Sequence, residues 1–150
     1  MRALVMGGGG FIGKNLLAHL HEKEIESVSF THDMPIKLLP PLLEDVDFIF
    51  HLAGVNRPQD PGEFSSGNQE LTEQLCEDIR ANGRQIPVIY TSSIQSDLDN
   101  PYGVSKKAAE DALVALYRDT CSPVYIYFKN QIFFLLPTPQ TIQNFYIYSF

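Results

Sequence analysis

Hydrophobic residues along this chain form short apolar runs that alternate with stretches in which apolar residues recur every three or four positions. Short runs bounded by turn residues are typical of buried parallel strands, and the longer spacing is typical of amphipathic helices. The runs predict five strands, at residues 3–6, 27–31, 47–51, 87–91 and 124–128. Because strands and helices alternate, the pattern predicts an α/β fold: a Rossmann-like, doubly wound parallel sheet with helices on both faces, incomplete at the C-terminus.

Three helices are predicted between these strands. The expected buried faces are Ile12, Leu16 and Leu20 in the first helix, Leu71, Leu75, Cys76 and Ile79 in the second, and Val104, Ala108, Ala112, Leu113 and Leu116 in the third. Gly83 is placed to end the second helix, and Asn100 followed by Pro101 is a good start for the third. Residues 32–45 hold three prolines and predict a loop with at most a short helix.

Length and charge narrow the function classes. The 150 residues match one average domain, which can bury a core without disulfides or a metal. The net charge of −7 argues against nucleic acid as the main partner, and no apolar run reaches the roughly 18 residues of a membrane span. Cys76 and Cys121 form no metal or disulfide pattern and fit a reducing compartment, so we expect a cytoplasmic protein. A homo-oligomer is compatible with these features.

Composition changes sharply near the end of the chain. All ten glycines lie at or before Gly103. Residues 124–150 hold nine of the seventeen aromatic residues and a single charged residue, Lys129. The enzyme-like composition therefore covers about the first four-fifths of the chain.

The clearest chemical signal is a glycine-rich turn between the first strand and the first helix. Gly7 permits a tight turn, Gly10 lets a pyrophosphate approach the backbone, and Gly13 lets the helix pack on the strand. The helix N-terminus that follows offers amide donors for an anion. A plain glycine-rich turn is the alternative, but the strand before it and the helix after it favour nucleotide binding.

A second signal follows the fourth predicted strand. Tyr102 and Lys106 lie four residues apart, which puts them on one helix face, one turn from each other. A neighbouring ammonium favours the phenolate form, so Tyr102 becomes a usable acid or base. Ser93, at the carboxyl end of the strand, can hydrogen-bond a substrate oxygen. Each feature alone is common, whereas the three in this order are not.

The chain resembles the short-chain dehydrogenase/reductase superfamily in its extended, nucleotide-sugar-modifying branch, over about residues 1–127. Residues 6–13 resemble the TGxxGFIG turn of that branch, with Met6 in place of Thr. The resemblance implies that Ser93, Tyr102 and Lys106 are the catalytic trio. The cofactor-binding residues that it implies are Gly7, Gly10, Phe11, Ile12, Gly13, Leu52, Ala53, Gly54, Tyr102 and Lys106, and Asn68 would support the active site.

Further stretches resemble a narrower family, the capsular-polysaccharide ketoreductases of the UDP-N-acetyl-L-fucosamine pathway. The stretches are residues 51–58, 63–64, 67–68, 92–95, 99–103, 105–106 and 124–127. This family implies reduction of a 4-keto, UDP-linked 6-deoxy-amino-sugar in capsule or surface polysaccharide biosynthesis, with the nucleotide sugar as the small-molecule partner. Ile94 and Gln95 follow the serine where dehydratases carry an acidic pair, so dehydration is disfavoured. Epimerisation uses the same trio and stays open.

The cofactor choice depends on the end of the second strand. An acid there favours NAD(H), and a basic residue favours NADP(H). The family's basic position falls on His32, with Asp33 beside it, so we expect NADP(H) over NAD(H). An ordinary loop histidine is the alternative at this position.

The resemblance stops at residue 127. The family continues with an arginine and a Pro-Asn-x-Phe-Gly loop, of which only Phe133 has a match here. We therefore predict a Rossmann domain at 1–127 and a divergent tail at 128–150, out of frame or truncated. The alternative is a genuine edge strand or a partner-binding tail. The missing substrate-binding part leaves a non-catalytic NAD(P)-binding fragment as the competing function.

Overall fold

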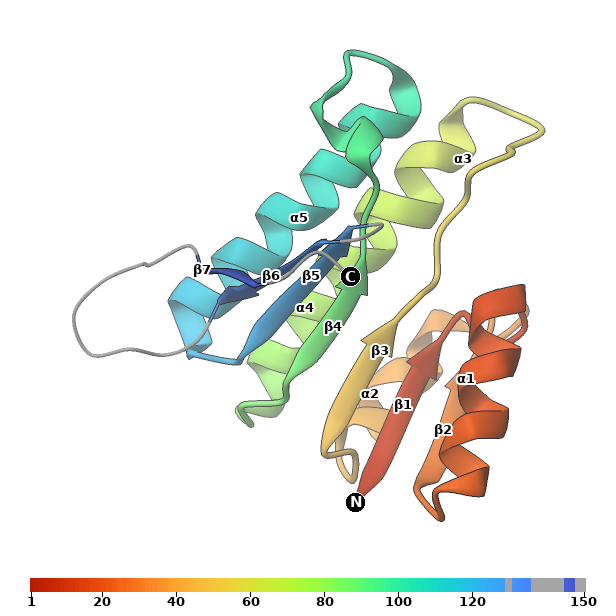
Figure 1. Cartoon of the computed structure of the whole chain (residues 1–150), viewed down its shortest axis with the longest axis vertical. Helices are drawn as coiled ribbons and strands as arrows, with labels where there is room; N and C mark the ends of the chain where they lie inside the picture. The colour runs from red at the N-terminus through yellow and green to blue at the C-terminus, as the bar shows by residue number, and fades with distance from the viewer. Residues whose placement is uncertain (129–130, 136–144, 148–150) are drawn as a thin grey trace.

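A sheet with helices on both faces forms the protein (Figure 1). The structure is a computed structural model that describes residues 1–128, 131–135 and 145–147. The strands are β1 (Arg2–Met6), β2 (Glu26–Phe30), β3 (Phe48–His51), β4 (Val88–Thr91), β5 (Val124–Phe128), β6 (Gln131–Leu135) and β7 (Phe145–Ile147). The α-helices are α1 (Phe11–Glu22), α2 (Leu39–Leu43), α3 (Gly62–Phe64), α4 (Leu71–Asn82) and α5 (Pro101–Thr120). Short helical turns are η1 (Ile36–Leu38), η2 (Ser65–Glu70) and η3 (Ile94–Asp97).

The strand order is β2-β1-β3-β4-β5-β6-β7. The first five strands are parallel, so the predicted Rossmann-like sheet is confirmed. Each of the five predicted strands is present with its bounds shifted by at most one residue. Beyond β5, the described part of the segment after residue 127 adds the antiparallel strands β6 and β7.

The two faces of the parallel sheet carry unequal layers. The larger core lies between the sheet and α2, α4 and α5, and includes Leu4, Ile49, Leu75 and Leu113. On the other face, Ala3 and Val5 of β1 pack against α1. Within the described part of the chain, no helix is long and apolar enough to cross a membrane.

The helix ends follow the sequence, but two of the predicted buried positions are wrong. The Asn100 side chain accepts a hydrogen bond from the Gly103 amide at 2.8 Å, and Gly83 ends α4 with φ of 72°. Ile12 and Val104 are 60% and 53% exposed, although apolar spacing placed them inside. Both lie in the first turn of a helix, at the end of the sheet where the strands end. The buried face of α5 instead includes Lys106.

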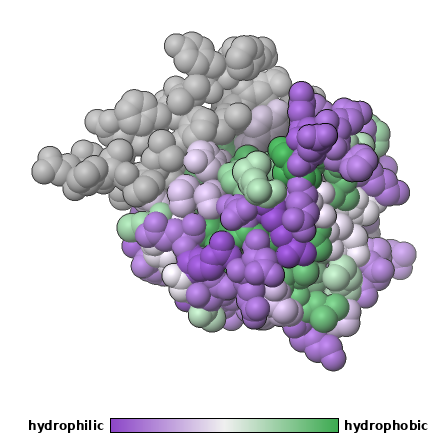
Figure 2. All heavy atoms as spheres, turned by 90° about the horizontal axis from the view of Figure 1, so that it is seen from below, coloured by the Kyte–Doolittle hydropathy of each residue, from purple (hydrophilic) through white to green (hydrophobic). Residues whose placement is uncertain are grey.

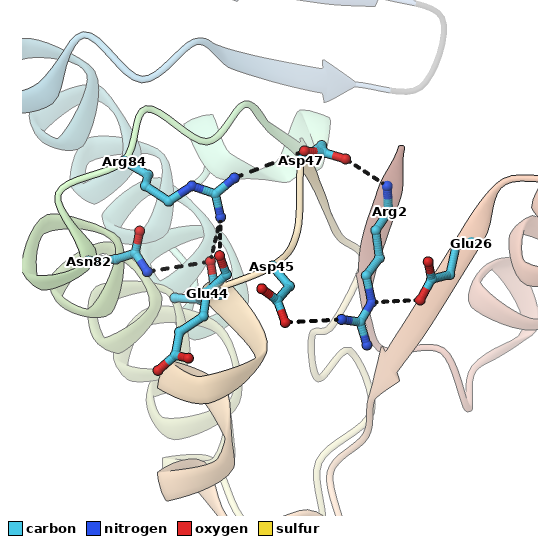
Figure 3. Close-up of polar contacts among 8 residues, drawn as sticks. Arg2, Glu26, Glu44, Asp45, Asp47, Asn82 and Arg84 are labelled. Atoms are coloured by element: carbon cyan, nitrogen blue, oxygen red, sulfur yellow. Dashed lines mark hydrogen bonds and ion pairs between the residues drawn. The ribbon is translucent and has the colours of Figure 1, made fainter.

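Polar contacts fasten the opposite end of the sheet, where the strands begin (Figure 3). The Arg2 amide donates to the Asp47 carboxylate at 2.8 Å, and the Arg2 guanidinium contacts Glu26 at 3.1 Å and Asp45 at 3.5 Å. Arg84 donates to the backbone carbonyls of Leu43, the last residue of α2, and of Glu44, which follows it. These contacts join β1, β2, the start of β3 and the end of α4.

Candidate cofactor and catalytic site

A cavity of about 670 Å³ lies at the carboxyl ends of β1, β2 and β3. Its walls come from the glycine turn, from residues 30–34 at the end of β2, and from residues 52–55 after β3, with further contributions from Ile36, Ser66, Gly67 and Leu71. Parallel sheets bind ligands at this edge, because the loops that follow neighbouring strands meet there. The structure therefore brings Gly7, Gly10, His32 and residues 52–54, which were predicted from separate parts of the sequence, to one cavity.

Glycines shape the turn in two different ways. Gly7 has φ of +84°, and a Cβ added to it would lie 2.7 Å from the Ala53 nitrogen. A Cβ on Gly13 would lie 2.6 Å from the Gly8 Cα. At Gly10 the nearest atom to an added Cβ is the Gly7 oxygen at 3.4 Å. The fold itself therefore requires glycine at 7 and 13, whereas at 10 the space is free for a ligand.

The start of α1 fits a diphosphate. Its N-cap is Gly10, which offers no side-chain cap, and its first turn holds no acidic residue. The first amides of a helix have no intrahelical acceptor, so those of residues 11–13 can bind an anion. The side chains of Phe11 and Ile12 are exposed and do not line the cavity. Any contribution of these two residues to binding comes from the backbone.

The predicted trio lies after β4 and in the first two turns of α5, and none of its three residues is among the described residues that line the cavity. Ser93 caps η3, and its Oγ accepts a hydrogen bond from the Gln95 amide at 3.2 Å. Tyr102 lies in the first turn of α5, half-buried, with its ring against Phe64 at a centroid distance of 5.6 Å. Lys106 follows one turn later and is buried. A Cβ on Gly54 would lie 3.0 Å from the Lys106 Nζ, so the ammonium lies against the Gly54 wall of the cavity.

Burial sets the electrostatics of Lys106. Its Nζ donates to the Thr91 carbonyl at 3.2 Å and lies 4.8 Å from the centroid of the Tyr90 ring. Burial lowers the pKa of Lys106 to about 8, and the Glu110 carboxylate opposes this effect. The ammonium is therefore the main form at neutral pH. Burial also raises the pKa of the Tyr90 phenol, which stays protonated.

A buried hydrogen-bond chain begins at His51, at the end of β3. Its Nε2 lies 2.8 Å from the Thr72 hydroxyl oxygen, and that hydroxyl donates its proton to the Asn68 carbonyl at 2.6 Å. His51 must therefore donate through Nε2, which leaves Nδ1 unprotonated. Burial, with the charge of Lys106, lowers the pKa of His51 to about 3. The imidazole is neutral over the whole physiological range.

The chain continues through Asn68 to the catalytic helix. Asn68 lies in η2, a π-helical turn, and its amide donates to the Val55 carbonyl at 2.9 Å and to Ser105 Oγ at 3.0 Å. Ser105 Oγ in turn donates to the Tyr102 carbonyl at 2.8 Å. Asn68 thereby links the wall of the cavity to the first turn of α5. Its predicted support of an active site stays a prediction. The participation of Thr72 and Ser105 was missed, because polar residues on a helix carry no signal of burial.

The end of β2 presents an acid and a histidine together. The His32 side chain is 99% exposed, and its Nδ1 lies 4.0 Å from the Asp33 carboxylate. A hydrogen bond from Thr31 is the main cause of the lowered pKa of Asp33. His32 and Asp33 both line the cavity, so either one can reach a ribose at this edge.

Known proteins resemble the chain over most of its length. The model of the family described as "NAD dependent epimerase/dehydratase family" matches residues 3–130. A UDP-2-acetamido-2,6-beta-L-arabino-hexul-4-ose reductase of Pseudomonas aeruginosa is 55% identical over 134 residues, which are 89% of this chain and 36% of the reductase. The chain thus spans about a third of the length of this relative.

Solved structures share the fold. The capsular polysaccharide assembling protein of Staphylococcus aureus is 36% identical, with a TM-score of 0.73 over 85% of this chain and 35% of that one. UDP-glucuronic acid 4-epimerase of Bacillus cereus in complex with NAD is 23% identical, with a TM-score of 0.74 over 86% of this chain and 56% of that one. The second likeness shows the fold alone.

Proposed function

Because the chain belongs to the NAD dependent epimerase/dehydratase family, we propose that it binds a nicotinamide dinucleotide in the cavity at the ends of β1, β2 and β3. We further propose that it serves the reduction of a 4-keto nucleotide sugar, a UDP-linked 6-deoxy-amino-sugar of capsule or surface polysaccharide biosynthesis. The identity of 55% to a reductase of that kind supports the substrate class.

One observation carries the proposal: the Lys106 ammonium lies against the Gly54 wall of the cavity. Gly54 belongs to the wall that a dinucleotide would line, and Lys106 belongs to the helix that carries Tyr102. A cofactor lying along residues 52–54 would therefore reach the residues that hold the reacting oxygen. The Asn68 bridge fixes the two parts relative to each other.

The bound nicotinamide would supply the hydride. Ser93 holds the keto oxygen by a hydrogen bond from its hydroxyl, and Tyr102 donates the phenolic proton to that oxygen as the alcohol forms. Lys106 binds the ribose hydroxyls and stabilises the phenolate that remains on Tyr102. The uncapped amides of residues 11–13 hold the diphosphate.

For the cofactor we favour NADP(H) over NAD(H). His32 lines the cavity edge with its side chain exposed, where it can meet a 2′-phosphate. Asp33 beside it would repel that phosphate, so the preference is expected to be modest. The free thiols of Cys76 and Cys121 fit a cytoplasmic location, where thiols stay reduced.

A nicotinamide-binding module without turnover is the second candidate. It is favoured by residues 128–134, which lack the Pro-Asn-x-Phe-Gly loop expected next to the nicotinamide. Without that loop, residues 128–134 lack the contacts expected at the nicotinamide, the reacting end of the cofactor.

Turnover separates these candidates. The protein is incubated with NADPH and a UDP-linked 4-keto-6-deoxy-amino-sugar, and cofactor oxidation and the sugar product are followed together. A reductase forms one 4-hydroxy sugar for each NADPH oxidised, and Tyr102→Phe abolishes this. In a second assay with the 4-hydroxy nucleotide sugar and oxidised cofactor, a 4-epimerised sugar without net change of the cofactor would replace the reductase with an epimerase. Cofactor binding without any product would leave the binding module.

A further inference from the structure

Helix α5 carries a second buried charged residue, one turn after Lys106. Glu110 is 7% exposed, and its carboxylate accepts a hydrogen bond from Ser92 Oγ in the segment after β4. Lys107 Nζ approaches the same carboxylate at 3.8 Å, but it lies nearer to Asp111, at 3.0 Å, on the exposed side of the helix. A buried carboxylate is costly unless it is paired. The position of Glu110 is therefore not that of an ordinary surface acid.

The hydrogen bond to Glu110 holds residues 91–93, the segment that contacts Lys106 and contains Ser93. The Thr91 carbonyl accepts a hydrogen bond from the Lys106 ammonium. Ser92 follows Thr91, and Ser93 of the trio is the next residue. The Ser92 amide donates to the Tyr127 carbonyl of β5 at 2.8 Å, while its hydroxyl is held by Glu110. Ser92 is thus fixed from both sides, between the acceptor of Lys106 and the serine of the trio.

The groups that face Lys106 come from three elements. Its own helix contributes Glu110, β4 contributes the ring of Tyr90, and β3 contributes His51. Tyr90 stays protonated and His51 stays neutral, for the reasons given above. Among the described residues around the ammonium, Glu110 is the acid whose negative charge favours the charged form of Lys106.

We propose that Glu110 is a positioning residue that keeps the Lys106 ammonium charged and holds its acceptor segment, residues 91–93, in place. The proposal deepens the proposed function and rests on it, since the role matters only if Lys106 holds the cofactor. Glu110 is not among the described residues that line the cavity, and it acts through Ser92 and through its charge.

The charge of Lys106 can be measured in the free protein, without cofactor. Lysines are dimethylated with isotope-labelled formaldehyde, the Lys106 signal is identified by its loss in Lys106→Met, and its NMR shift is followed against pH. The wild-type signal is expected to titrate near the pKa of about 8. Glu110→Gln is expected to move the midpoint down by about half a pH unit or more, because the opposing charge is gone.

Two matched variants separate charge from position. Asp111→Asn removes the neighbouring exposed acid of the same helix and is expected to leave the Lys106 midpoint unchanged. Ser92→Ala keeps the Glu110 charge but removes the tether. It is expected to shift the midpoint little and to weaken NADPH binding several-fold. Should Glu110→Gln fail to fold, Glu110→Met removes the charge with an apolar side chain of similar size.

An unchanged Lys106 midpoint in Glu110→Gln or Glu110→Met would overturn the charge role. NADPH binding of wild-type strength in Ser92→Ala would overturn the positioning role. If wild-type protein binds no cofactor at all, the proposed function fails. The midpoint shift between wild type and Glu110→Gln would still be measured in that case, so the two failures are distinguishable.

Discussion

The two ends of the parallel sheet are built on opposite principles. At the carboxyl end, helix α1 starts without a side-chain cap, the glycine turn leaves backbone open, and Lys106 and His51 are buried with shifted pKa values. At the amino end, side chains reach across strands and close the edge with ion pairs and hydrogen bonds. Each open feature of the carboxyl end costs stability and can be used by a ligand, whereas the contacts at the amino end close the edge of the sheet.

The surface of the amino end is largely polar, as expected for an edge that side-chain contacts close (Figure 2). Figure 2 looks at the molecule from below, toward the end where the strands begin, and shows hydrophilic residues spread between smaller hydrophobic areas. The contacts there are made by partly or fully exposed side chains, such as Asp45 at 75% exposure. Exposed ion pairs each contribute little to stability, so this end is stabilised by several weak contacts rather than by one strong one.

Gly13→Ala is expected to have the largest effect, because it places a methyl group against backbone at the carboxyl end. The added Cβ would lie 2.6 Å from the Gly8 Cα, and neither backbone can move without opening the turn. The free energy of unfolding should fall by about 3 kcal/mol or more in urea denaturation. Gly10→Ala is the control, with its nearest atom at 3.4 Å and an expected loss below about 1 kcal/mol. An equal loss of unfolding free energy in the two variants would mean that the fold requires glycine at position 10 as much as at position 13.

The lowered pKa of His51 predicts that the free energy of unfolding falls in acid. The unfolded histidine takes up a proton near pH 6.5, whereas the folded one stays neutral down to about 3, so the unfolded chain binds the extra proton. Stability is complete above pH 6.5 and is lost as the pH falls toward 3, at about 1.4 kcal/mol per pH unit. His51→Asn should flatten this slope in acid denaturation. A surface variant, His21→Gln, should keep it, and an unchanged slope in His51→Asn would contradict the prediction.

Lys106→Met tests whether the site costs stability. Below pH 8 the folded protein carries a buried ammonium, and between about 8 and 10.5 it loses the proton before the unfolded chain does. Wild-type stability should therefore rise with pH over that interval, and the variant should show no such rise. At neutral pH we expect the variant to be more stable by about 1–2 kcal/mol in thermal or urea unfolding, while cofactor binding is lost. A destabilised variant would show that Lys106 serves the fold.

Asp47→Asn should give the smallest effect, at the amino end. It removes the charge next to the Arg2 amide, the Arg84 guanidinium at 4.0 Å and the chain's terminal amine at 3.9 Å. The loss should be about 1 kcal/mol or less, and should shrink further in high salt because these groups are exposed. NADPH affinity should be unchanged. A change in affinity would show that the two ends are coupled.

Much of the carboxyl end could be predicted from the sequence, because its elements carry strong local signals. The glycine turn and the cap at Asn100 each require particular residue types, and both are confirmed. The stop at Gly83, which lies at the amino end, is confirmed as well. The buried polar groups were beyond reach. Glu110 and Thr72 sit on helices where acidic and hydroxyl residues are ordinarily exposed, and only the packing of α4 and α5 on the sheet places them inside.

The errors at Ile12 and Val104 have the same origin. Apolar spacing places residues on a helix face but does not say how far a neighbouring element extends over it. Both residues lie in the first turn of a helix, at the carboxyl end of the sheet. The ion pairs of the amino end were also unpredictable, because Arg2, Asp47 and Arg84 are far apart in sequence and meet only in the assembled sheet.

The most direct test of the account is a fluorescence titration of NADPH and NADH into wild-type protein and Gly10→Ala. The wild type should bind both cofactors, with a modest preference for NADPH. Gly10→Ala should lose less than about 1 kcal/mol of stability but weaken binding by at least about tenfold, since its Cβ would fill the approach to the α1 amides. Failure of the folded wild-type protein to bind either cofactor, or equal binding by Gly10→Ala, would contradict the cofactor site.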